Sequence, residues 1–164
     1  MVEVEVMIMA AVLVGTATIL VISAGFIPTI TMTAWAAFVP CQPAQPCTGT
    51  AEGDAIIGTE GADNISGLGG NDAVNARDGN DTVTGGEGND ELIGGDGADR
   101  MSGGSGNDRL NGDTGNDIIF GGGGNDELTG DAGADQFRCG GGTDTINDFN
   151  PAEGETKTAD CENF

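Results

Sequence analysis

The chain has 164 residues and a formal net charge of −22, with 27 acidic residues, 5 basic residues and no histidine. This charge disfavours nucleic acid as a partner, because its phosphates would be repelled. The lack of histidine excludes histidine-dependent metal sites and catalytic triads. Hard cations that bind carboxylate oxygens are the ligands that the composition favours.

Residues 1–39 are apolar, with Glu3 and Glu5 as their charged side chains. Residues 6–27 are long enough to cross a membrane as a hydrophobic helix, which Pro28 would end. Three interpretations stay open: a secretory signal with an A-x-A-like cleavage site at residues 34–36, an uncleaved anchor that contacts the membrane, or a buried core helix. The first two predict an extracellular or cell-surface location.

Residues 40–48 form a short hinge rich in proline and cysteine. Four cysteines fit an oxidising compartment, and they lie in two local pairs, Cys41 with Cys47 and Cys139 with Cys161. Proximity favours these two disulfides, although four cysteines allow three pairings. A zinc site is the rival interpretation, which the lack of a C-x2-C motif disfavours.

Residues 49–147 contain a nine-residue repeat. Aspartate recurs at Asp54, Asp63, Asp72, Asp81, Asp90, Asp99, Asp108, Asp117, Asp126, Asp135 and Asp144. Two residues after each aspartate comes an apolar residue: Ile56, Ile65, Val74, Val83, Leu92, Met101, Leu110, Ile119, Leu128, Phe137 and Ile146. Glycine lies two residues before every aspartate except the first, where Glu52 replaces it. An acidic disordered linker, the alternative for this composition, would not keep three positions in phase.

This pattern resembles the RTX (repeats-in-toxin) family, whose nonapeptide is G-G-x-G-x-D-x-U-x with U apolar. Residues 85–93 match it most closely. The resemblance implies an all-β fold, a right-handed parallel β-roll with two nonapeptides per turn, which the hydrophobic helix precedes. Equivalent loops would then stack 18 residues apart, and three-residue strands would point one side chain inward. Residues 148–164 would cap the roll.

The resemblance also implies Ca²⁺ between stacked loops, held by aspartate carboxylates and backbone carbonyls. The candidate aspartates are Asp63, Asp72, Asp81, Asp90, Asp99, Asp108, Asp117, Asp126, Asp135 and Asp144. The candidate loop glycines are Gly86, Gly88, Gly95, Gly97, Gly104, Gly106, Gly115, Gly122, Gly124 and Gly133. With Asp54, the aspartates give nine pairs 18 residues apart, and so up to about nine ions. Weaker sites are expected where Glu52 and Ala76-Arg77 replace glycine.

One inward apolar residue per repeat makes a small core, so we expect folding to require calcium. The expected function is an exported calcium-binding structural, surface or interaction module, and no catalytic constellation suggests an enzyme. One alternative is a non-catalytic accessory piece of a secreted RTX enzyme. Another is an adhesive or ice-binding relative. Ice-binding relatives present a regular threonine array, of which only Thr114 is found here. Ile118 and Phe120 would point outward together, either as a patch for a protein or cell-surface partner or as two ordinary exposed residues.

Overall fold

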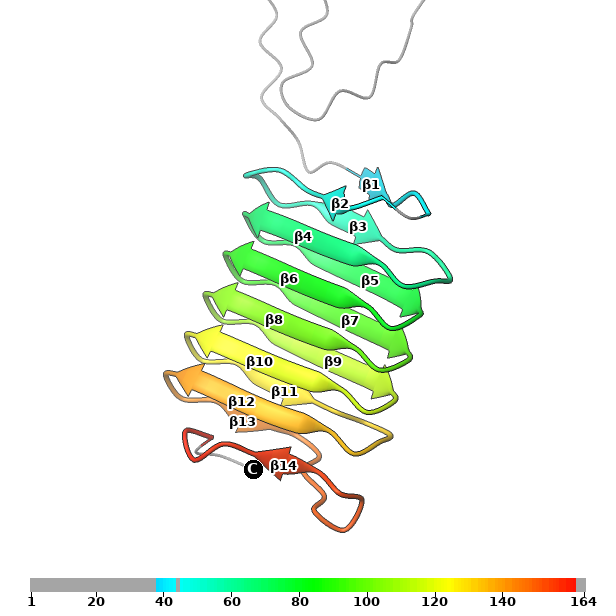
Figure 1. Cartoon of the computed structure of the whole chain (residues 1–164). Coiled ribbons are helices and arrows are strands. Elements are labelled where there is room, and N and C mark those ends of the chain that lie inside the picture. The colour runs from blue at the N-terminus through cyan, green and yellow to red at the C-terminus, as the bar shows by residue number, and fades with distance from the viewer. Residues whose placement is uncertain (1–37, 44, 162–164) are drawn as a thin grey trace, which may run out of the picture. The chain divides into compact units, whose positions relative to one another are not determined.

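The computed structural model describes residues 38–43 and 45–161, which form a parallel β-roll of two facing sheets (Figure 1). The predicted hydrophobic helix lies outside the described residues. Within them, none of the chain forms a helix long and apolar enough to span a bilayer.

The strands alternate between the two sheets along the chain. The first sheet contains β1 (Phe38–Pro40), β3 (Ala55–Ile57), β5 (Ala73–Asp78), β7 (Glu91–Asp96), β9 (Arg109–Thr114), β11 (Glu127–Thr129) and β13 (Thr145–Ile146), in that spatial order. The second contains β2 (Cys47–Thr48), β4 (Asn64–Gly69), β6 (Thr82–Glu87), β8 (Arg100–Ser105), β10 (Ile118–Gly123), β12 (Gln136–Gly141) and β14 (Thr156–Lys157), also in order.

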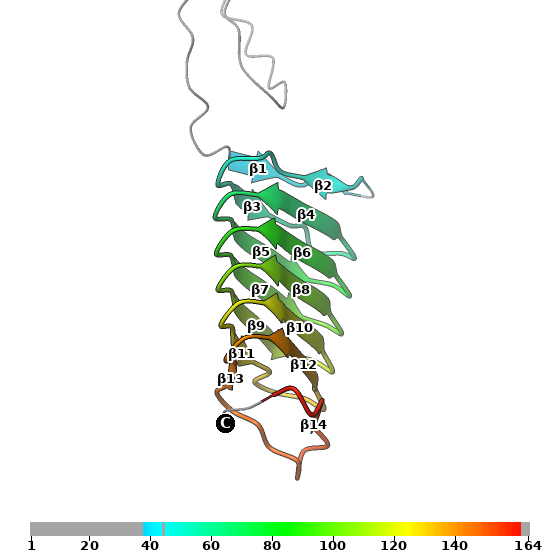
Figure 2. The same cartoon turned by 90° about the vertical axis from the view of Figure 1, so that its left-hand side faces the viewer.

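Neighbouring strands within a sheet are one full turn apart in the sequence. Val83 pairs with Met101 in the second sheet, and Leu92 pairs with Leu110 in the first, both in parallel register. The register confirms that two nonapeptides make one turn. Figure 2 shows these turns stacked one on the next along the roll.

The core is a double row of apolar side chains between the sheets. The eleven predicted inward residues, Ile56, Ile65, Val74, Val83, Leu92, Met101, Leu110, Ile119, Leu128, Phe137 and Ile146, are each no more than 2 % exposed. Each aspartate is two residues away from one of them. The fixed spacing therefore keeps every aspartate at the same corner of its turn.

The strands are longer than the three residues predicted. Six-residue strands such as β7 have two inward positions, occupied there by Leu92 and Gly94. The second position holds glycine in most turns, and the aspartate side chain of the following loop lies against it. Because this glycine leaves room for the carboxylate, the chain stays extended through a second inward position.

Both ends of the roll are closed by a disulfide, with the predicted pairing confirmed as Cys41–Cys47 and Cys139–Cys161. At the first end, β1 crosses the predicted boundary between the apolar segment and the hinge, and β2 lies within the predicted hinge; the two strands pair with β3 and β4. The roll therefore begins before residue 49. At the other end, β14 pairs with β12.

The outer faces of the two sheets differ in character. On the first sheet, Arg109 lies in register between Glu91 and Glu127, and its guanidinium is 3.2 Å from the Glu127 carboxylate. On the second sheet, Phe120 lies between the guanidinium groups of Arg100 and Arg138, at 4.6 and 5.0 Å from its ring centre. The arginines thus cover part of the Phe120 ring, for which the sequence left open a partner patch or an ordinary exposed residue.

Candidate metal centre

The repeat aspartates form two columns, one along each edge of the roll. The first aspartate column is Asp54, Asp72, Asp90, Asp108, Asp126 and Asp144, each of which directly precedes a strand of the first sheet. The second aspartate column is Asp63, Asp81, Asp99, Asp117 and Asp135, which precede strands of the second sheet. All eleven side chains are buried.

Hydrogen bonds connect each column from turn to turn. The amide of Asp90 donates to Oδ1 of Asp108 at 2.9 Å, and the amide of Asp108 donates to Oδ1 of Asp126 at 2.9 Å. The same bond, at 2.7–2.9 Å, joins each of the nine aspartate pairs that the sequence placed 18 residues apart. The structure therefore brings together every predicted pair.

The second carboxylate oxygen of most aspartates lacks a protein donor. In the part of the chain that the structure describes, a buried Oδ2 has no hydrogen-bond partner in Asp72, Asp81, Asp90, Asp99, Asp108, Asp117, Asp126, Asp135 and Asp144. A buried carboxylate oxygen without a partner is costly in free energy. A cation or a proton beside each Oδ2 would remove this cost.

A carbonyl oxygen of the next turn lies close to the same place. A Cβ atom on Gly103 would meet Oδ2 of Asp108 and, at 2.6 Å, the carbonyl oxygen of Gly121. The arrangement recurs at the buried glycines Gly67, Gly85, Gly94, Gly112 and Gly121, which face Asp72, Asp90, Asp99, Asp117 and Asp126. Carboxylate and carbonyl oxygens gathered without a donor fit a hard cation such as Ca²⁺, which takes six to eight oxygen ligands.

These oxygens are distributed along the roll. Over residues 38–43 and 45–161, the acidic and cysteine side chains form no cluster of three that could hold a metal ion. The carboxylates instead stack one per loop, with backbone carbonyls of adjacent turns beside them. Carboxylates and backbone carbonyls are the two kinds of oxygen that the family resemblance implies as calcium ligands.

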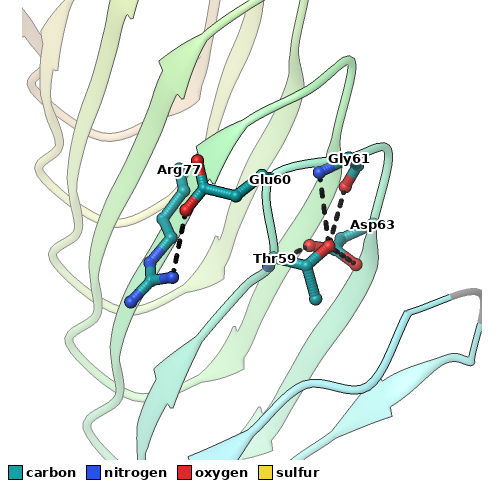
Figure 3. Close-up of polar contacts among 5 residues, drawn as sticks. All are labelled: Thr59, Glu60, Gly61, Asp63 and Arg77. Carbon is teal, nitrogen blue, oxygen red and sulfur yellow. Dashed lines mark hydrogen bonds and ion pairs between the residues drawn. The ribbon is translucent and has the colours of Figure 1, made fainter.

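Two aspartates of the columns have a different neighbour. Residue 76, five before Asp81, is alanine, and residue 139, five before Asp144, is a disulfide-bonded cysteine. Ala76 and Cys139 therefore place a Cβ beside the carboxylate, whereas the other loops have glycine at this position. Arg77, which also replaces a glycine before Asp81, extends along the surface to Glu60, at 3.2 Å (Figure 3).

Protein donors already satisfy the first aspartate of each column. The amide of Thr59 donates to Oδ2 of Asp63 at 2.6 Å, and the Thr59 hydroxyl lies 3.2 Å from Oδ1 (Figure 3). In the other column, the amide and hydroxyl of Thr50 reach Oδ2 of Asp54 at 2.5 and 3.0 Å. Asp63, a predicted ligand, thus has its carboxylate bound by threonine.

Burial raises the pKa above the usual value of 3.8 in eight of the column aspartates: Asp72, Asp81, Asp90, Asp99, Asp108, Asp117, Asp126 and Asp135. The pKa rises to about 6 in Asp72, Asp81 and Asp108 and to about 7 in Asp117. Desolvation is the largest cause, and the carboxylates one turn away add to it by repulsion, while the amide bond to Oδ1 opposes it. The columns therefore favour a bound positive charge, either a proton or a cation.

The predicted loop glycines shape the turns. All of them except Gly133 adopt positive φ, for instance 129° in Gly88 and 126° in Gly106. A Cβ on Gly106 would collide with the carbonyl oxygen of Gly88, one turn away. The buried glycines that face the carboxylates were not among the predicted site residues, although glycine at 85, 94, 103, 112 and 121 repeats every nine residues.

An asparagine ladder outside the first aspartate column was also missed. The amide of Asn89 donates to the side chain of Asn71 at 2.9 Å, and Asn107, Asn125 and Thr143 continue the series. In the second column, asparagine alternates with alanine, as in the bond from Ala98 to Asn80. The sequence signal was asparagine directly before the aspartate.

Comparison with known proteins agrees with this geometry. A family model described as the RTX calcium-binding nonapeptide repeat, in four copies, matches residues 48–83, 75–110 and 111–146. These segments together span more than half of the chain. No curated protein matches the sequence.

Proposed function

Because the chain belongs to the RTX calcium-binding nonapeptide repeat family, we propose that its β-roll binds Ca²⁺ along both aspartate columns and requires it to fold at neutral pH. The observation that carries the proposal is the row of buried Oδ2 atoms without a protein donor. Bound calcium would neutralise these carboxylates and hold adjacent turns together. The same carboxylates would oppose folding when calcium is absent, because they would be buried as unneutralised charges.

The strongest candidate ligands are the aspartates that face both a bare glycine and a carbonyl of the next turn. These are Asp72, Asp90, Asp99, Asp108, Asp117 and Asp126. Asp81 and Asp144 face residues with a Cβ, and we propose that their sites bind calcium more weakly. Threonine donors bind the carboxylates of Asp63 and Asp54, so the first turn depends less on calcium for its stability.

We propose an extracellular structural or interaction role without catalysis for these residues. Two disulfides suit an oxidising compartment, where calcium is also the available hard cation. The sequence has no histidine. Phe120 with Arg100 and Arg138 is a mixed aromatic and basic surface in an otherwise acidic chain, which supports an interaction role.

The test is a calcium titration of the full chain at pH 7.5, followed by circular dichroism and calorimetry. The wild type should gain β-structure as calcium binds and lose it in chelator. Asp108→Asn should lower the number of tightly bound ions and raise the calcium concentration at the folding midpoint about tenfold or more, the effect of roughly 1.4 kcal/mol.

Asp78→Asn is the matched control, because Asp78 is exposed and carries the same charge outside the columns. It should leave both quantities unchanged. An unchanged β-sheet spectrum in chelator at pH 7.5 would rule out calcium-dependent folding, and equal effects of the two variants would rule out the columns as the site.

A further inference from the structure

The second aspartate column has an additional member that breaks the nine-residue spacing. In the pairing of β14 with β12, Thr156 lies opposite Gln136, so Glu155 occupies the position next to Asp135. The amide of Thr156 donates to the carbonyl of Asp135 at 2.8 Å, as the amide of Gln136 does to Asp117. Glu155 thus lies where the next aspartate of the column would be.

The Glu155 side chain is as buried as the column aspartates. It is 4 % exposed, although it lies directly before β14, the last strand of the described residues. Its Oε2 accepts a hydrogen bond from the amide of Asn150 at 2.5 Å. Its Oε1, within the described part of the chain, has no hydrogen-bond partner, and it therefore repeats the state of the Oδ2 atoms.

Acidic groups surround this position. Oδ2 of Asp135 is also buried without a donor, and it lies against Gly130. Asp148 accepts the amides of Gly130 and Asp131 at 3.1 and 2.6 Å and so fixes the last loop of the column. Burial raises the pKa of Glu155, and Asp148 and Asp135 add to the rise by repulsion.

The nearest basic residue in the sequence is held elsewhere. The ammonium of Lys157 lies 5.6 Å from the ring centre of Phe149 and donates to the carbonyl of Cys161 at 3.3 Å. The charged groups that act on Glu155 and on Asp135 are all carboxylates. The two unpartnered oxygens therefore share a negative environment at the end of the column.

We propose that Asp135 and Glu155 form a terminal cation site that takes one further Ca²⁺ beyond the nine aspartate pairs. The site rests on the proposed calcium binding and extends it to the C-terminal tail. Its ion would join the last loop of the second aspartate column to β14, at the end of the roll that Cys139–Cys161 also closes. Glu155 follows Asp135 by 20 residues, whereas the column aspartates are 18 residues apart, and its side chain is one methylene longer than that of aspartate.

The experiment counts calcium ions per full chain by native mass spectrometry and calorimetry at pH 7.5, in the wild type, Glu155→Gln and Glu153→Gln. The control, Glu153→Gln, removes the same charge from an exposed residue of the same loop. We expect Glu155→Gln to bind one ion fewer and Glu153→Gln to bind as many as the wild type. Equal counts and affinities in all three proteins would overturn the terminal site.

A wild-type measurement covers the case in which Glu155→Gln does not fold. The carboxyl ¹³C resonance of Glu155 should shift on calcium addition and should report an ionised group at saturation. A resonance that stays that of a neutral acid in saturating calcium would overturn the terminal site. If the wild type binds no calcium at all, the proposed function itself fails, which distinguishes the two outcomes.

Discussion

Each aspartate inside a column connects its turn to the two adjacent turns. In Asp108, Oδ1 accepts the amide of Asp90, the amide donates to Asp126, and the carbonyl accepts the amide of Glu127 at 2.8 Å. Oδ2 is the atom left for a cation. Oδ1 and the backbone groups of the residue therefore fix the register of adjacent turns, while Oδ2 is available for the metal. This double role explains why aspartate repeats so strictly.

Threonine in the first loop should stabilise the roll independently of calcium. Thr59→Val keeps the shape of the side chain but removes the hydroxyl that contacts Asp63 and the backbone of Gly61. We expect a loss of about 1 kcal/mol in the free energy of unfolding. Urea unfolding in saturating calcium measures it. Thr59→Ser keeps the hydroxyl and should retain most of the stability; an equal loss in both variants would contradict this role.

Leu68 holds a backbone conformation that favours glycine. Its φ is 82°, and its side chain is 50 % exposed, so little apolar burial offsets the strain. Leu68→Gly should raise the free energy of unfolding by about 1 kcal/mol. Thermal unfolding in calcium measures it, with Leu68→Ala as the control that keeps a Cβ. A glycine variant no more stable than the alanine variant would contradict the strain.

The sequence predicted some of these residue roles and missed others. The repeat places glycine where Leu68, Arg77, Asp113 and Asp131 occur, and all four adopt positive φ, a strain that these departures from the motif could have indicated but that was not predicted. Thr50 and Thr59 occupy the same motif position in the first turn. Their capping of Asp54 and Asp63 could not be predicted, because a missing glycine alone does not reveal a new hydrogen bond.

Within a strand, the glycine at the second inward position has no Cβ, and this leaves space for the aspartate carboxylate. A Cβ on Gly103 would press on Oδ2 of Asp108 and on the carbonyl of Gly121. We expect Gly103→Ala to lower the free energy of unfolding in calcium by about 3 kcal/mol and to weaken calcium binding. Chemical unfolding and a calcium titration measure the two effects.

Gly123 offers a matched control in the same sheet, since a Cβ there would meet no atom within 4 Å. Gly123→Ala should be neutral or stabilising by about 0.5 kcal/mol, because alanine restricts the unfolded chain more than glycine does. Equal destabilisation by both substitutions would show that the cost comes from β-strand glycine in general and not from the carboxylate.

The strand order followed from the nine-residue period together with the family resemblance, which implies two repeats per turn and so fixes which residues are neighbours. The ends of the roll did not follow from it. Residues 38–48 lack the motif, yet β1 and β2 pair with the two sheets, and Cys41 and Cys47 are buried in the core. Glu155 reaches its column after 20 residues, so no periodic search would find it.

For the whole molecule, the raised aspartate pKa values predict opposite effects of pH with and without calcium. The folded state holds protons more tightly than the unfolded chain, since its pKa values reach about 6 in Asp108 and about 7 in Asp117 against a usual 3.8. The proton-linked stability of the metal-free roll is therefore complete below pH 3.8 and is lost as pH rises through 6 to 7.

Metal-free protein should accordingly show more β-structure at pH 4 than at pH 7.5 by circular dichroism. Calcium affinity should change in the other direction, falling between pH 7.5 and pH 5.5 because protons compete for the same oxygens. Isothermal titration calorimetry at several pH values measures this change in calcium affinity. A calcium affinity independent of pH over this interval would contradict a shared site.

The direction of the aspartate hydrogen bonds has a consequence for synthesis of the chain. The amide and carbonyl of Asp90 both bond to residues 18 and 19 positions later, Asp108 and Arg109. A polypeptide that emerges N-terminus first therefore cannot complete any loop until the following turn is outside. The most recently emerged turn cannot complete its hydrogen bonds until the next turn has emerged. Folding therefore lags behind emergence by one turn and is complete only when β14 has emerged.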